Sequence, residues 1–219
     1  MTLDAAETDD GAGRTRRPPQ ERGLRTQAAI LDAAVRVLAE DGYAAASTVR
    51  VQERAGVSRG RLLHHFPSRE ELFVAAVHHL AAARLDELVV GAELPADPVA
   101  RIAVAIDAMW ASNQAAAFQA SLELWLAARH DERLRAALLP TERRMGAMLL
   151  ETQQALFGPE LAARPGFADL MELLVSSMRG TALTYAITGA DSSSEPNLAL
   201  WRELVRDRLL GPAPETSQG

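Results

Sequence analysis

Apolar residues recur along most of the chain with the 3.6-residue period of an α-helix. The first clear case follows Thr26, where Ile30, Ala34, Val37 and Leu38 share one helix face. Further helical repeats follow Asp97-Pro98, pass through residues 118–126, follow Asp131 as far as Phe157, and cover residues 167–188 and 196–209. Alanine and leucine dominate and β-branched runs are rare, so the chain is predicted to be all-α.

Capping signals divide the N-terminal third into short helices. Ser47, Ser58 and Ser68 each stand where a helix is expected to begin, and serine is a good N-cap. Gly42 and Gly56 stand where the preceding helices end, and glycine suits the left-handed conformation there. The helix that follows Ser58 must end before the next proline.

Polar stretches mark the ends and the breaks of the chain. Residues 1–20 and 212–219 show no apolar period and are predicted to be disordered tails. Residues 91–96, 159–166 and 189–195 are expected to be loops. We find no internal repeat.

Composition excludes several classes of protein. The 219 residues include no cysteine, which rules out disulfides, cysteine-ligated zinc and a thiol nucleophile. The apolar runs are too short to span a membrane, and the acidic N-terminus does not resemble a secretory signal. A cytoplasmic protein without a membrane partner is therefore expected.

Charge is distributed unevenly. The net charge is -6, yet residues 14–69 hold eleven arginines and only five acids, whereas residues 70–219 hold twelve arginines and twenty acids. A basic N-terminal part can meet phosphates while the acidic remainder stays away from them. The alternative is that arginine merely replaces lysine, which the chain lacks. Composition alone does not separate the two.

Residues 47–66 have the pattern of a helix-turn-helix, with a glycine at the sharp corner. The second helix presents Arg59, Gly60, Arg61 and His64 near its N-terminal, outward side. Arginine reads guanine edges by paired hydrogen bonds, and a small residue allows close approach to the major groove. The alternative is a tight helical corner with surface arginines.

A longer stretch carries a family resemblance. Residues 50–73, RVQERAGVSRGRLLHHFPSREELF, with the preceding helix of residues 28–42, resemble the DNA-binding domain of TetR-family transcriptional regulators. The resemblance spans about residues 25–75. It implies a three-helix helix-turn-helix domain, set here at residues 21–70, and a C-terminal helical effector and dimerisation domain, set at residues 71–211.

The resemblance also implies contacts with a double-stranded DNA operator. Arg59, Gly60 and Arg61 match positions that face bases in this family. Ser47 and Thr48 match positions near the DNA backbone.

His64 and Arg69 match family positions that commonly touch phosphate. Two residues depart from the family pattern. Leu63 replaces a tyrosine and lacks the hydroxyl that would reach a phosphate, while Gln52 replaces a small alanine. A separate group of arginines at positions 14, 16 and 17 is either a minor-groove arm or, as we favour, a solvated tail.

The central helices of TetR-like proteins enclose an effector pocket, and flexible or aromatic apolar residues suit such a site. The candidate ligand-binding residues are Met109, Trp110, Phe118, Leu122, Trp125, Met145, Met148, Ser177 and Thr181. Each apolar member is alternatively plain core, and Ser177 and Thr181 are alternatively interface or core groups. An apolar effector is expected.

No sequence motif for catalysis, cofactor or metal binding is found, so we expect no enzyme activity, no cofactor and no metal. The paired histidines at 64–65 and 78–79 are adjacent, and adjacent side chains diverge on a helix. There are two rival hypotheses: a helical enzyme or small-molecule carrier, and a DNA-binding module without an effector.

The last two long helices, residues 167–188 and 196–210, are too apolar for surface helices of a monomer. A four-helix interface between two copies would bury them, as in the family, and a two-fold dimer matches palindromic DNA. The alternative is a monomer with a larger core. The leading hypothesis is therefore a homodimeric TetR-like regulator, expected to be a repressor that a small molecule releases from its operator. The sequence itself does not distinguish repression from activation.

Overall fold

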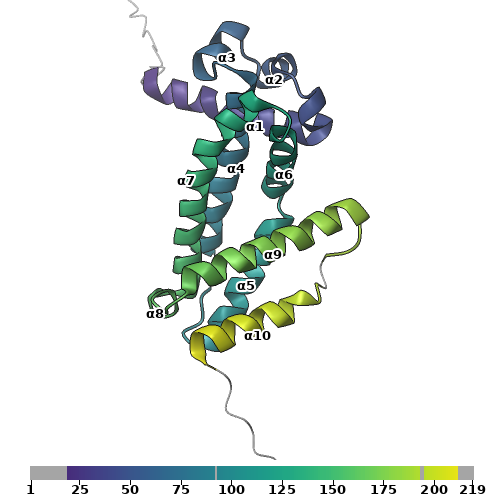
Figure 1. The fold of residues 1–219 in the computed structure, drawn as a ribbon. Coiled ribbons are helices and arrows are strands. Elements are labelled where there is room, and N and C mark those ends of the chain that lie inside the picture. The colour runs from purple at the N-terminus through teal and green to yellow at the C-terminus, as the bar shows by residue number, and fades with distance from the viewer. Residues whose placement is uncertain (1–18, 92, 193–194, 212–219) are drawn as a thin grey trace, which may run out of the picture.

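The computed structural model describes residues 19–91, 93–192 and 195–211. This part of the chain contains helices and no strand, which confirms the all-α prediction (Figure 1). The helices are α1 (Pro19–Ala45), α2 (Thr48–Ala55), α3 (Arg59–His65), α4 (Arg69–Gly91), α5 (Pro98–Gln114), α6 (Ala116–Ala128), α7 (Glu132–Phe157), α8 (Pro159–Ala162), α9 (Phe167–Thr188) and α10 (Asn197–Leu210). The first helix includes the last two residues of the predicted N-terminal tail, and the rest of both predicted tails lies outside the described residues.

The expected caps form. The hydroxyl oxygens of Ser47, Ser58 and Ser68 accept hydrogen bonds from backbone N–H groups three residues later, at 3.3, 3.3 and 3.1 Å. Each bond satisfies an N–H that a helix start leaves without a partner. Gly42 breaks α1 with φ 67°, and Gly56 ends α2 with φ 64°. Local sequence thus fixes the corners of the N-terminal region.

One loop prediction is wrong. Residues 159–166 were expected to be a loop, but Pro159–Ala162 forms the single-turn helix α8. Proline suits the first position of a helix, and Leu161 is buried in the core. The helix before it, α7, continues through Pro140 to Phe157, as expected.

Two buried clusters form the core. The first joins α1–α4 to α6 and the N-terminal part of α7. The second joins α5, the C-terminal part of α7, α8, α9 and α10. The first cluster crosses the boundary predicted at residues 70 and 71, because Leu72 and Phe73 of α4 and Leu124 of α6 belong to it. The N-terminal helices are therefore packed firmly on the central ones.

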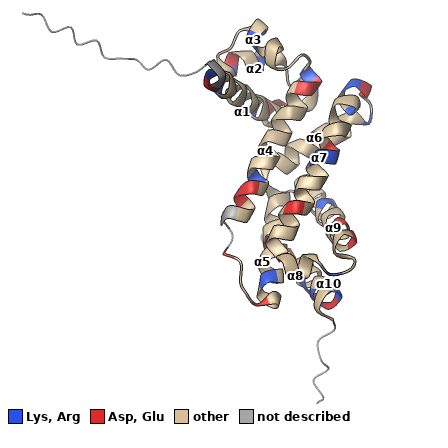
Figure 2. Ribbon diagram, turned by 90° about the vertical axis from the view of Figure 1, so that its left-hand side faces the viewer, with Lys and Arg blue, Asp and Glu red and all other residues tan. Residues whose placement is uncertain are grey.

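The helices form an elongated molecule. Helices α1–α3 lie at one end, α4, α6 and α7 run through the middle, and α5, α9 and α10 lie toward the other end (Figures 1 and 2). None of the described helices is long and apolar enough to cross a membrane.

Candidate nucleic-acid interface and effector pocket

Helices α2 and α3 form the predicted helix-turn-helix. Val51 of α2 and Leu62 of α3 are fully buried, so each helix is held on the core by one apolar anchor. At the corner, the N–H of Val57 donates to the carbonyl oxygen of Gln52, at 3.1 Å. The opposite face of α3 is left at the surface.

That surface carries unpaired cations. Arg59, Gly60, Arg61 and His64 are all exposed, and α3 contains no acidic residue (Figure 2). Within the described chain, the guanidinium groups of Arg59 and Arg61 form no ion pair and no hydrogen bond; the one cap hydrogen bond of Arg61 comes from its backbone N–H. Both guanidinium groups are therefore available to a ligand.

The arginines of α2 differ sharply from those of α3. Arg54 forms an ion pair with Glu40 at 2.6 Å, and Arg50 pairs with Asp41. Arg54 also lowers the pKa of Glu40, chiefly through their hydrogen bond. The two α2 cations are thus neutralised by α1, which leaves α3 as the basic element of the motif.

The residues at the start of α2 that are predicted to lie near the DNA backbone stand at the edge of this surface. Ser47 and Thr48 are half-buried at the start of α2, and the Ser47 hydroxyl already accepts the cap hydrogen bond. Leu63, which replaces the family tyrosine, is 43% exposed on α3. It follows Arg59 by about one helical turn and is next to His64 in sequence.

Arg69 is engaged inside the protein. Its Nε donates to the carbonyl oxygen of Ala46 at 3.0 Å, and its Nη2 donates to the carbonyl oxygen of Tyr43. Its guanidinium carbon lies 4.0 Å from the centre of the Tyr43 ring and 5.4 Å from that of Phe73. Arg69 therefore joins the start of α4 to the corner between α1 and α2.

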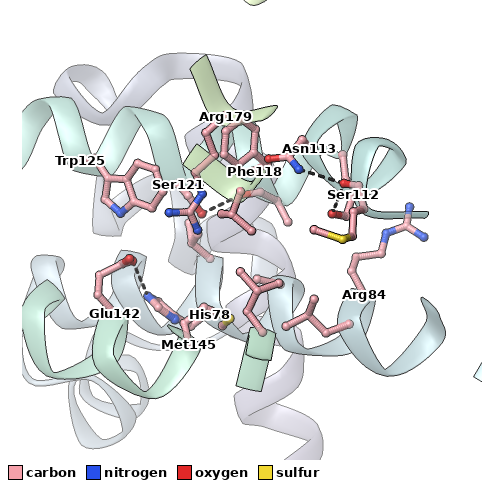
Figure 3. Close-up of a pocket in the computed structure, with 18 of the residues that line it drawn as sticks. His78, Arg84, Ser112, Asn113, Phe118, Ser121, Trp125, Glu142, Met145 and Arg179 are labelled. Atoms are coloured by element: carbon pink, nitrogen blue, oxygen red, sulfur yellow. Dashed lines mark hydrogen bonds and ion pairs between the residues drawn. The ribbon is translucent and has the colours of Figure 1, made fainter. Parts of the chain in front are cut away.

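A pocket of about 100 Å³ lies between α4, α5, α6, α7 and α9 (Figure 3). Its wall is mostly apolar but includes several polar and charged side chains. The polar and charged members are His78, Arg84, Ser112, Asn113, Ser121, Glu142, Gln153 and Arg179. A wider groove shares three lining residues with it, namely Arg84, Ser112 and Ala115.

Four of the nine residues nominated from sequence line this pocket, namely Met109, Phe118, Trp125 and Met145. The other five do not, and helical phase explains why: one residue further along a helix turns a side chain by about 100°. Trp110, next to Met109, instead packs on Trp201 with ring centres 5.4 Å apart.

The side chains of the other four nominated residues also face away from the pocket because of their helical phase. Leu122 and Met148 are half-buried outside the lining. Ser177 accepts a hydrogen bond from the Trp201 indole at 3.1 Å, and Thr181 donates to the Ser177 carbonyl. The face of α9 that meets the pocket carries Val175 and Arg179, not the nominated hydroxyls.

The charged part of the pocket was missed by sequence reasoning. Nε2 of His78 lies 3.3 Å from Oε1 of Glu142. Burial would raise the pKa of Glu142, but hydrogen bonding from His78 and Trp125 and the nearby Arg179 charge outweigh it, so this pKa is lowered. The sequence did contain a signal for these residues. Their helical spacing places Glu142 and Gln153 on the same face of the helix as Met145, which was nominated as a pocket residue.

Among the described residues, no three His, Cys, Asp or Glu side chains are grouped so as to hold a metal ion.

The fold, the exposed basic helix and the sequence relatives together define the protein as a helix-turn-helix transcriptional regulator. Residues 30–76 match the family described as "Bacterial regulatory proteins, tetR family". The CymR regulator of Pseudomonas putida is 31% identical over 175 residues, which cover 77% of this chain and 83% of CymR. The chain belongs to the TetR family of bacterial regulators.

Two other comparisons agree. An uncharacterized HTH-type transcriptional regulator of Mycobacterium tuberculosis is 28% identical over 193 residues, or 86% of this chain and 97% of that protein. The crystal structure of the multidrug binding protein EbrR, complexed with imidazole, shares the fold with a TM-score of 0.63 at 23% identity, covering 93% of this chain and 99% of EbrR.

Proposed function

We propose that the protein is a homodimeric repressor that binds a palindromic DNA operator through α3 and leaves it when a small molecule fills the pocket. One observation carries this proposal: α4 begins against the helix-turn-helix and lines the pocket about two turns later. Arg69 holds its first turn to the α1–α2 corner, and Val77, His78, Ala81 and Arg84 face the pocket. A change at the pocket is therefore transmitted through one helix.

Sequence readout is assigned to the exposed side of α3. Arg59 and Arg61 lack partners within the described chain and are long enough to hydrogen-bond base edges in the major groove. Gly60 between them lets the helix approach the bases. His64, with Ser47 and Thr48 at the start of α2, is assigned to the phosphate backbone.

A dimer supplies the second recognition helix. Leu173 and Ile187 of α9 and Leu200 and Leu210 of α10 are exposed, with Ile187 at 77%. The opposite faces of both helices are buried in the second core, so these residues form a second, outward apolar surface. Covering it with another copy gives a two-fold dimer suited to a palindrome.

Release requires two states that bind the effector unequally, because equal affinity would shift neither population. Helix α6, like α4, connects the pocket to the core beneath the helix-turn-helix. Leu124 belongs to the core beneath the helix-turn-helix, while Ser121 and Trp125 line the pocket. An effector that moves α4 and α6 changes the separation of the two recognition helices.

Selection of duplexes from a random pool tests the DNA-binding part. We expect the bound sequences to converge on a palindrome with half-sites about one helical turn apart or somewhat more. The double variant Arg59→Ala with Arg61→Ala is expected to lose this enrichment, whereas Arg133→Ala, an exposed arginine on α7, is the matched control. Failure of the wild-type protein to enrich any sequence would contradict the proposal.

A further inference from the structure

We propose that the pocket takes a small carboxylic acid with an apolar body, and that Arg179 holds the carboxylate; this rests on the proposed role of the pocket as the effector site. Arg179 projects from α9 into the pocket beside Trp125, and the His78–Glu142 pair lies on the opposite wall (Figure 3). The inference thereby adds an anionic group to the apolar effector expected from sequence.

The guanidinium of Arg179 lacks acceptors. It is partly buried, and in the described part of the chain it forms no hydrogen bond and no ion pair. Its guanidinium carbon lies over the face of the Trp125 ring, 4.8 Å from the ring centre. A guanidinium has five N–H donors, and none of the Arg179 nitrogens is fully buried, so they are accessible from the pocket. An incoming carboxylate would accept from two of them at once.

Glu142 is not the acceptor for the Arg179 guanidinium. No oxygen of Glu142 lies within 4.0 Å of an Arg179 nitrogen, and the carboxylate is directed to His78. Burial lowers the pKa of Arg179, and the charge of Glu142 only partly opposes this. The pocket thus contains a partly buried cation without an ion-pair partner among the described residues, and a ligand can neutralise its charge.

A second donor points to the same ligand chemistry. Gln153 is only 3% exposed, and its Nε2 has no hydrogen-bond partner. Both Gln153 and Arg179 line the pocket, together with Leu149 and Val175. A buried donor without a partner at Gln153 and the unpaired guanidinium of Arg179 in the same pocket favour a ligand rich in acceptor oxygens.

Pocket size and wall chemistry limit the rest of the ligand. The volume of about 100 Å³ is smaller than the roughly 300–1,000 Å³ of sites for drug-sized ligands. Met109, Phe118 and Met145 provide a soft apolar wall for the body of the molecule. A short aliphatic chain or a single ring is therefore the body that fits.

Calorimetry on the full-length protein without DNA tests the inference with matched acid and amide pairs. The probes are butyrate and butyramide, benzoate and benzamide, and phenylacetate and phenylacetamide. We expect at least one acid to bind about tenfold or more tightly than its amide, because only the acid forms a charge-assisted hydrogen bond with Arg179. If no acid is preferred over its amide, the inference is wrong.

Arg179→Met separates ligand binding from a structural role. The variant is expected to lose about tenfold or more of the affinity for the preferred acid while its affinity for the amide changes by less than about threefold. Arg133→Met is the control and should retain the acid preference. An Arg179→Met protein that folds, by circular dichroism, and keeps the acid preference would overturn the inference, and Arg179→Gln serves if the methionine variant does not fold.

The two proposals fail in different ways. If an acid binds through Arg179 but leaves DNA affinity unchanged, effector release is wrong and the ligand assignment stands. If a neutral molecule fills the pocket and releases DNA while no acid is preferred, the ligand assignment is wrong and the release mechanism stands.

Discussion

The guanidinium group of Arg69 stacks over the ring of Tyr43, 4.0 Å from its centre, and donates a hydrogen bond to the carbonyl oxygen of the same residue. A second hydrogen bond reaches the carbonyl oxygen of Ala46. These carbonyl groups follow Gly42, where α1 is broken. Arg69 thereby holds the start of α4 to the corner between α1 and α2, in addition to the apolar packing of Leu72 and Phe73 on the first core. This makes Arg69 a positioning residue for the DNA-binding end.

Arg69→Met is expected to lower the free energy of unfolding by about 1–3 kcal/mol, because it removes two hydrogen bonds from a charged donor. DNA affinity should fall about equally for all sequences, since the recognition helix loses its support rather than a base contact. Urea unfolding and fluorescence anisotropy measure the two effects. Arg133→Met should change neither, and an Arg69→Met protein of wild-type stability would show that Arg69 is not structural.

Arg59→Ala and Arg61→Ala are each expected to relax base preference at one position of each half-site, with a loss of about 1–3 kcal/mol in discrimination. Arg54→Ala is the comparison, because Glu40 already neutralises that guanidinium. Binding to a panel of single-base operator variants measures the preference. Unchanged preference in both α3 variants would refute their assignment to the bases.

Leu200→Glu is expected to convert the proposed dimer to a monomer and to abolish tight binding to a palindrome, because it places a charge in the proposed apolar interface. The control is Leu139→Glu on α7, which is 51% exposed against 59% for Leu200 but lies away from α9 and α10. Sedimentation velocity measures the assembly. A Leu200→Glu dimer, or a monomer in the Leu139→Glu control, would contradict the proposed interface.

Gly158→Ala is expected to destabilise the protein by about 1–3 kcal/mol. The φ of 81° and ψ of 164° lie in a region reserved for glycine. A Cβ there would also lie 2.8 Å from Cζ of Arg101, whose guanidinium is held by the carbonyls of Ala155 and Leu156.

The matched control for this substitution is Gly146→Ala, at an exposed position within α7 with open space around it. It should stabilise by up to about 1 kcal/mol, because alanine is the better helix former. Thermal unfolding of both variants measures the difference. Equal melting temperatures would contradict the strain assigned to Gly158.

Glu142→Gln tests the charged wall of the pocket through pH. The folded-state pKa of Glu142 lies below its ordinary value of 4.5, so its charge stabilises the fold fully above about pH 4.5. That contribution is lost as the pH falls through the folded pKa. The stability gap between wild type and variant, about 1 kcal/mol at pH 7, should therefore narrow below pH 4.5. Urea unfolding at pH 7 and pH 4 measures it, and a gap that is independent of pH would refute the charge interaction.

The sequence predicted the DNA-binding end well because its signals are local. Serine caps, glycine breaks and a proline lie within a few residues of the structure they determine, so α2, α3 and their corner follow from short-range rules. The resemblance placed Arg69 at phosphate, and that contact stays a prediction. The hydrogen bonds of Arg69 to Tyr43 and Ala46 could not be predicted, because their acceptors are positioned by the break of α1 at Gly42.

The pocket was harder to predict because it depends on which helix faces meet. Helix α9 is apolar on several sides, so periodicity did not show whether Ser177 or Arg179 would turn toward α6 and α7. The sequence likewise did not show which of Met109 and Trp110 would line the pocket. Both residues are buried, but Trp110 packs on Trp201 instead. Tertiary packing decided these positions.

Titration of the selected palindrome with the full-length dimer, with and without a ligand that calorimetry places in the pocket, tests the central claim most directly. We expect saturating ligand to raise the Kd for DNA about tenfold or more, and bound DNA to weaken the ligand by the same factor, as linkage requires. A ligand that binds the wild-type protein through Arg179 and leaves the Kd for DNA unchanged would contradict the account.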